Sequence, residues 1–445
     1  MIGVRTFPSF MIAAAALFAS MVLGAAALLI EKHNTVVYLP LAQGAIYAVF
    51  AFLLLREKHG LTEEQSRRYF VYLLGFGIVM RAMLLFAPPH SSDIYRYVWD
   101  GRVQAHGINP YRYIPADPAL ARLRDADIYS NINRREFAPT IYPPAAQAVF
   151  FAVSRLSESV TMMKAAMLAV EALAVWALIQ LLAARGLPVI LVSLYFLHPL
   201  AVWEIAGSGH VDVVAVAFLL LALLAAEKDK RFASGAALAA GVLTKYFPLA
   251  LTPAIYRRWD WRMPAAFIAA ALALYLPYLS VGKKLSGYLG GYADEEFGEE
   301  NGLYILAILK QLGLGAVALP LFLGAGALTL FALAWRAGFR ANPSKPDLLG
   351  AFTIAICCTV LFTPHYAWYF LWLVPFLCFF PWPSVFWLTL SAPLLYRTAW
   401  PPTIAGFSIE YVPFAVLLAV ENLKFFNQKE AARGRAVARR QAHGG

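Results

Sequence analysis

Residues 90–102 hold the side chains of this sequence best suited to chemistry, in the order His-Ser-Ser-Asp-Ile-Tyr-Arg-Tyr-Val-Trp-Asp-Gly-Arg. Two carboxylates, an arginine and a tyrosine recur there at the spacing i, i+3, i+4, i+7, which predicts one face of a helix. They are Asp93, Arg96, Tyr97 and Asp100. A carboxylate can take a proton from a hydroxyl, and a guanidinium can hold an anion.

The opposite face of this predicted helix is apolar and aromatic. It carries Ile94, Tyr95, Val98 and Trp99. We therefore expect the helix to lie in the membrane interface with its aromatic rings among the lipid headgroups. A plain juxtamembrane helix with solvated charges is the alternative. The turn-forming segments 108–113, 131–135 and 140–144, rich in Asn, Pro, Tyr and Arg, favour walls around a polar, anionic or sugar-like substrate.

The rest of the chain must place these residues at a membrane. Of 445 residues, 61% are hydrophobic and 14% charged, whereas soluble domains carry about a quarter charged residues. Because a spanning helix needs about 20 apolar residues, we predict an all-α, polytopic bundle with about twelve crossings and additional re-entrant helices. The crossings are residues 9–30, 36–55, 69–87, 160–184, 188–205, 212–227, 263–281, 315–335, 347–363, 366–381, 384–397 and 402–421.

Basic connectors set the predicted orientation. The net charge of +11 indicates topology rather than a nucleic-acid partner, because the cations lie between apolar segments. The loop 88–141 is predicted on the non-cytoplasmic face, and the basic tail 424–445 in the cytoplasm. The apolar run 232–256 has basic clusters on both sides and is interrupted near its middle, so we expect a re-entrant hairpin there. The short run 143–156 is predicted to be re-entrant or interfacial.

Several of these runs resemble a known family. Residues 92–102, 107–111 and 142–144 are similar to the first outer loop of GT-C-fold glycosyltransferases, most of all to the bacterial polyprenol-phosphate-mannose-dependent α-mannosyltransferase-like group. Weaker matches extend the resemblance over most of the chain, at residues 198–199, 209–212, 245–248 and 363–369. The resemblance implies one integral-membrane domain over 1–445 in a bacterial-type inner membrane. It also implies transfer of a hexose, mannose in this group, from a polyprenyl-phosphate donor to a glycan or lipid acceptor.

The resemblance makes Asp93 the catalytic base of an inverting transfer on the non-cytoplasmic face. The departing phosphate needs positive charge more than a general acid. Relatives often carry paired acids here, whereas Ser91 and Ser92 precede a single Asp93. We therefore assign no metal ligand, and participation of a divalent metal stays open. The predicted substrate-binding residues are Arg96, Tyr97, Asp100, Arg102, Tyr111, Arg134, Arg135, Tyr142, His210, Asp212, Lys245 and His365.

For the last four of these residues, roles other than substrate binding remain open. His210 and Asp212 could instead cap a helix or pair between helices, and Lys245 could extend to the cytoplasmic interface rather than bind a lipid phosphate. His365 belongs to an aromatic segment that is either an interfacial belt or a sugar-stacking platform. The acidic residues 294–300 suit a solvated loop, with a role in positioning the acceptor as the alternative.

Two other function classes remain. A lipid-linked sugar or small-solute transporter, including a flippase, would place ionisable residues near the midplane of several helices. Here most of them cluster around one outer loop, which favours an enzyme. A scaffold subunit would tolerate loss of both Asp93 and Arg96. The sequence has no Gly-rich βαβ turn, which argues against a nucleotide-sugar donor.

Overall fold

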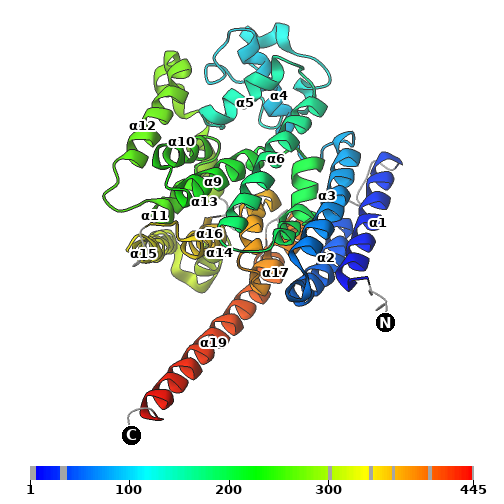
Figure 1. Cartoon of the computed structure of the whole chain (residues 1–445). Coiled ribbons are helices and arrows are strands. Elements are labelled where there is room, and N and C mark those ends of the chain that lie inside the picture. Colours follow the sequence, from blue (N-terminus) through cyan, green and yellow to red (C-terminus); the bar gives the residue numbers. More distant parts are fainter. Residues whose placement is uncertain are drawn as a thin grey trace.

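The computed structural model describes residues 7–30, 38–298, 303–339, 344–362, 366–398 and 403–442. Within these residues the secondary structure is helical and no strand occurs, which confirms the all-α prediction. The chain starts with three helices, drawn in blue in Figure 1, of which the first packs on the second and on the third. They are α1 (Ser9–Ile30), α2 (Tyr38–Glu57) and α3 (Glu63–Leu85).

The predicted outer loop contains two short packed helices. The run that begins at Asp93 forms α4 (Asp93–Ala105), as its spacing predicts, and the short apolar run forms α5 (Pro144–Ser154). A Cβ on Gly101 would lie 2.4 Å from the carbonyl oxygen of Phe150. The two helices can therefore approach this closely only with a glycine at that position. Figure 1 shows this region at the end of the molecule opposite the C-terminal end of α19 (Ile404–Ala442).

The prediction that the apolar face of α4 lies in the membrane interface is wrong. Ile94, Val98 and Trp99 are buried inside the protein, so they are not available to lipid headgroups. The loop that follows α4 folds back over this face, and the ring of Tyr129 lies 5.5 Å from that of Trp99. The periodicity shows that the helix has two faces, but it cannot show that a distant loop covers the apolar one.

The middle of the chain forms a hairpin beside two long helices. The long helices are α6 (Val160–Ala184) and α9 (Asp212–Glu227), with a bent pair of helical segments, Val189–Phe196 and Pro199–Gly207, between them in the chain. The hairpin consists of α10 (Arg231–Val242), a break, a 3-10 helix (Phe247–Leu251) and α11 (Thr252–Ile255).

The two ends of this hairpin lie at the same end of the bundle. Nη1 of Arg257 is 3.6 Å from Oδ1 of Asp229, and Nε of Arg231 is 3.8 Å from Oδ2 of Asp260. The chain therefore runs out and returns, as the two flanking basic clusters predict. Its placement within a membrane stays a prediction.

The C-terminal half adds helices around the same core. The first two of them, α12 (Arg262–Tyr275) and α13 (Leu289–Gly298), are connected by the 3-10 helix Leu276–Ser286. The named helices are α12 (Arg262–Tyr275), α13 (Leu289–Gly298), α14 (Tyr304–Leu309), α15 (Ala318–Gly338), α16 (Leu348–Phe362), the 3-10 helix Ala367–Cys378, α17 (Pro383–Ser391), α18 (Leu395–Thr398) and α19.

Seven helical segments among the described residues are long and apolar enough to cross a membrane, or eight if the bent pair is one span. The chain is therefore a membrane protein. Several predicted crossings are shorter helices of 10–17 residues, such as Leu348–Phe362 and Ala367–Cys378. The count of about twelve crossings is not confirmed.

Candidate active site

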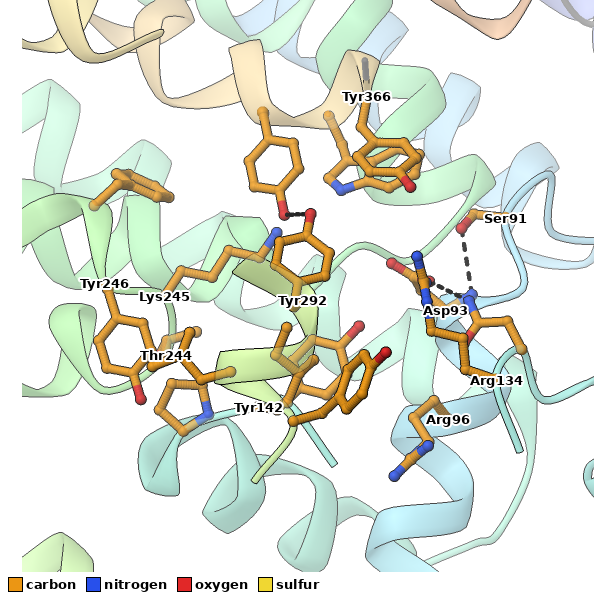
Figure 2. A pocket seen from close by; sticks show the side chains of 18 of the residues that line it. Ser91, Asp93, Arg96, Arg134, Tyr142, Thr244, Lys245, Tyr246, Tyr292 and Tyr366 are labelled. Atoms are coloured by element: carbon orange, nitrogen blue, oxygen red, sulfur yellow. Dashed lines mark hydrogen bonds between the residues drawn. The ribbon is translucent and has the colours of Figure 1, made fainter. Parts of the chain in front are cut away.

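A cavity of about 630 Å³ lies where the start of α4 meets the hairpin tip, α13 and the segment after α16. Five of the predicted site residues line it, namely Asp93, Arg96, Arg134, Tyr142 and Lys245. Figure 2 shows Asp93 and Arg134 on one side of this pocket and Lys245 on the other, with Tyr292 between them. The pocket thus gathers residues that are far apart in the sequence.

Asp93 is the first residue of α4 and is half-buried. Its Oδ1 accepts a hydrogen bond from Nδ2 of Asn133 at 2.9 Å, and its backbone N–H donates to Oγ of Ser91 at 3.3 Å. A carboxylate in the first turn of a helix is stabilised as an anion by the free N–H groups there. Asp93 is therefore a positioned carboxylate that faces a cavity.

Arg96, which lines the pocket, and Asp100, which lies behind it, form a buried network. Nε of Arg96 donates to Oδ1 of Asp100 at 2.9 Å, and Nε2 of Gln147 donates to Oδ2 at 2.9 Å. The hydroxyl of Thr140 donates to the same Oδ2, while Nη1 of Arg96 donates to the carbonyl oxygen of Ala138 at 3.2 Å. Asp100 does not line the pocket. It holds Arg96 and ties α4 to the 138–147 segment.

We expect Asp100→Asn to lower the free energy of unfolding by about 3 kcal/mol, because it leaves the buried Arg96 without its counter-ion. Arg96 is only 5% exposed, so water cannot replace the carboxylate. Thermal unfolding in detergent measures the effect. Asp127→Asn is the matched control, because Asp127 is an exposed carboxylate of the same loop. Equal unfolding midpoints for the two variants would contradict the structural role of Asp100.

Tyr97 and Tyr111 support the pocket from behind. The ring of Tyr97 stacks on Phe150 at 4.6 Å between centroids and meets the ring of Tyr142 edge-on at 4.9 Å. The hydroxyl of Tyr111 donates to the carbonyl oxygen of Tyr142 at 2.7 Å. Neither residue lines the cavity. Both fix Tyr142, which does.

Lys245 reaches the pocket from the hairpin tip. Its Nζ donates to Oδ1 of Asp212 at 2.8 Å and lies 4.2 Å from the ring centroid of Tyr369. These contacts hold Lys245 at the pocket, which favours the ligand-binding alternative over extension to the cytoplasmic interface. Asp212 is 1% exposed and lies behind the pocket wall. Asp212 therefore positions Lys245 and does not itself contact the cavity.

His210 also lies behind the wall. Its ring stacks on Trp368 at 4.1 Å between centroids, and its Nε2 is 3.3 Å from Oε2 of Glu204. The hydroxyl of Tyr396 donates to both oxygens of Glu204, at 2.8 and 2.9 Å. Trp368 and Tyr396 line the cavity. The buried pair of His210 and Glu204 therefore supports two aromatic side chains of the wall.

Arg102 and Arg135 bind carboxylates away from the pocket. Arg102 binds Asp125 at 2.6 Å and Glu158 at 2.7 Å. Burial alone would raise the pKa of Asp125, but hydrogen bonds from two backbone N–H groups and from Arg102 lower it. Arg135 pairs with Glu136 at 2.9 Å. His365 lies outside the described residues.

The sequence reasoning missed several lining residues. His90 lies just before Asp93, and burial, together with the charges of Lys164 and His210, lowers its pKa to about 4. It is therefore neutral at pH 7. Membership in the polar run 90–102 was the only sequence signal for it. The other missed residues include Asn133, Thr244, Tyr246, Tyr288, Tyr292 and Tyr396.

No group of three or more His, Cys, Asp or Glu side chains among the described residues is arranged to hold a metal ion. No curated protein and no solved structure matches the chain significantly. The family model described as "Alpha-(1->6)-mannopyranosyltransferase, N-terminal domain" matches residues 4–260. This match confirms the predicted GT-C-type glycosyltransferase and favours an enzyme over a transporter or a scaffold. The chain belongs to this family of membrane mannosyltransferases.

Proposed function

We propose that this protein transfers mannose from a polyprenyl-phosphate-linked donor to a hydroxyl group of a glycan or lipid acceptor. The transfer inverts the anomeric carbon, and Asp93 is the general base. The observation that carries the proposal is the make-up of the cavity: a half-buried carboxylate at one side, a lysine at the other, and an apolar wall beyond the lysine.

The apolar wall suits a prenyl chain. The ring of Phe247, which directly follows Tyr246 and the hairpin tip, lies 4.0 Å from that of Trp372. A chain held there would place its phosphate next to Lys245 and its sugar toward Asp93. Phe247 and Trp372 form this wall, and the cavity has further apolar lining at Cys358, Phe362 and Leu395.

The phosphate would bind Lys245. An ammonium group has three N–H donors, and one of them is used by Asp212. Two donors remain for phosphate oxygens. Arg96 is a weaker candidate for this contact, because its guanidinium is committed to Asp100 and to the backbone of Ala138.

The chemistry is a single displacement. The acceptor hydroxyl gives its proton to the Asp93 carboxylate while its oxygen forms a bond to the anomeric carbon. The bond from that carbon to the phosphate oxygen breaks on the opposite side, and the electron pair leaves with polyprenyl phosphate. Lys245 stabilises the negative charge that develops there. No step proposed here requires a metal ion.

We place the reaction on the non-cytoplasmic face of a bacterial-type inner membrane. Two features support this orientation. The 88–141 loop and the C-terminal end of α19, which enters the basic tail, lie at opposite ends of the molecule (Figure 1). The basic clusters that flank the hairpin lie together at one end, as expected for residues retained in the cytoplasm.

The proposal is tested with purified protein in detergent and a panel of polyprenyl-phosphate hexoses, with release of polyprenyl phosphate as the readout. We expect release only with the mannose donor and an acceptor. Since inversion forms an α linkage only from a β-linked donor, the β-linked anomer should react at least about 100-fold faster than the α-linked one. The anomeric NMR coupling of the product checks this.

Folded protein that consumes no polyprenyl-phosphate hexose would refute the donor class. Use of the α-linked donor with retention would refute the single displacement and would turn Asp93 into a nucleophile. Either result leaves the family membership intact.

A further inference from the structure

The helix α13 lies across one side of the pocket and is held there by polar contacts. The backbone N–H of Tyr288, just before the helix, donates to the carbonyl oxygen of Thr140 at 3.0 Å. The Tyr292 and Tyr369 hydroxyls are 3.0 Å apart. Gly287 has φ +54°, and a Cβ there would lie 1.9 Å from the Thr140 oxygen. The turn thus requires glycine to bring α13 against the outer loop.

The contact between α13 and the loop is centred on an ion pair. Nε and Nη2 of Arg134 donate to Oε2 of Glu295 at 3.0 and 2.8 Å. The hydroxyl of Tyr288 donates to the other oxygen of Glu295. Arg134 lines the cavity, and Glu295 holds it from outside the lining. Arg134 also has φ +50°, a strained conformation for a residue other than glycine.

Arg134 therefore differs from Lys245 as a cation. Burial would lower the pKa of Arg134, but its hydrogen bonds to Glu295 and Tyr366 raise it, so its charge is permanent. Nε and Nη2 of Arg134 both donate to Glu295, whereas Lys245 uses only one of its three N–H donors on Asp212. Arg134 therefore has fewer donors left for a phosphate, while a neutral sugar hydroxyl needs only one of its remaining N–H groups.

We propose that the side of the cavity between α13 and residues 133–142 is the subsite for a neutral glycan acceptor. Arg134 orients its hydroxyls, Glu295 positions Arg134 and Tyr288, and the rings of Tyr288 and Tyr292 pack against the sugar ring. The inference rests on the proposed function in one respect, because it takes Lys245 to be the phosphate side. Asp93 and Arg134 both line the cavity, and Asn133, the neighbour of Arg134 in the chain, donates to Asp93, which suits a base that acts on the acceptor.

The experiment measures ligand binding to the full-length protein in detergent by calorimetry, without any turnover. The acceptor probe is α-1,6-mannobiose, and the donor-side probe is farnesyl phosphate with farnesol as its uncharged match. We expect Glu295→Gln to weaken mannobiose binding about tenfold and to leave farnesyl phosphate binding within about twofold of wild type. Tyr288→Phe keeps the ring but loses the hydrogen bond to Glu295, and it should weaken mannobiose binding about threefold. The matched control is Asp294→Asn, an exposed neighbouring carboxylate, which should change neither.

Equal mannobiose affinity in wild type and Glu295→Gln, or no measurable mannobiose binding to wild type, overturns the subsite. Tighter binding of farnesyl phosphate by Glu295→Gln also overturns it, because Arg134 would then be an anion site. Failure of the proposed function looks different. In that case wild type shows no preference for farnesyl phosphate over farnesol, while the mannobiose results stand on their own.

Discussion

Asp93→Asn should lower the rate of polyprenyl phosphate release by about 10³-fold, within the range that a positioned general base contributes. Asparagine keeps the shape of the side chain, and its oxygen can still accept the hydrogen bond from Asn133. It cannot take the proton of the acceptor hydroxyl. The loss should therefore appear in kcat, with KM for donor and acceptor nearly unchanged. Single-turnover release of polyprenyl phosphate measures it.

Asp127→Asn serves again as the control, because it removes one exposed carboxylate from the same loop. It should keep the wild-type rate. The unfolding midpoint of Asp93→Asn should also match wild type, since Asp93 is half-buried and makes one side-chain hydrogen bond to Asn133 through Oδ1. A folded Asp93→Asn protein with more than a tenth of wild-type activity would remove Asp93 from the mechanism.

Lys245→Met should lower kcat/KM by about 100-fold, because the phosphate that leaves loses its cation. The same change strips the buried Asp212 of its counter-ion, so a loss of stability of about 3 kcal/mol should accompany it. Adding Asp212→Asn separates the two effects. The double variant should regain most of the wild-type unfolding midpoint and none of the lost activity.

Recovery of activity together with stability in the double variant would show that Lys245 matters for packing alone. The single variant Asp212→Asn gives an independent reading. It leaves Lys245 charged and without its partner, so farnesyl phosphate should bind at least as tightly as to wild type. Weaker binding would contradict a phosphate site at Lys245.

The parts of the site that could be predicted from the sequence are local. The spacing of Asp93, Arg96 and Asp100 predicts the helix that carries them, and two basic clusters with an interruption between them predict the hairpin that carries Lys245. Both features depend on residues within about one helical element of each other, where periodicity and charge are informative.

The parts that could not be predicted depend on partners far away in the chain. Arg102 and Arg134 both belong to polar, arginine-rich runs, yet one is bound by Glu158 behind the helix and the other by Glu295 at the pocket. No pattern around an arginine tells which carboxylate it will meet. Asp100 shares a helix face with Asp93, but Gln147 and Thr140 enclose it. The fold decided between substrate contact and structural support.

The hairpin also bears on how the chain is synthesised and inserted. Its run 232–256 contains a single charged residue, Lys245, and a lysine at the centre of an inserting segment costs about 3 kcal/mol. Its partner Asp212 emerges earlier from the ribosome, at the start of α9. In the proposed topology the counter-ion is in the bilayer before the lysine arrives, and the basic clusters on either side are not translocated. Biogenesis and the proposed catalysis would then depend on the same ion pair.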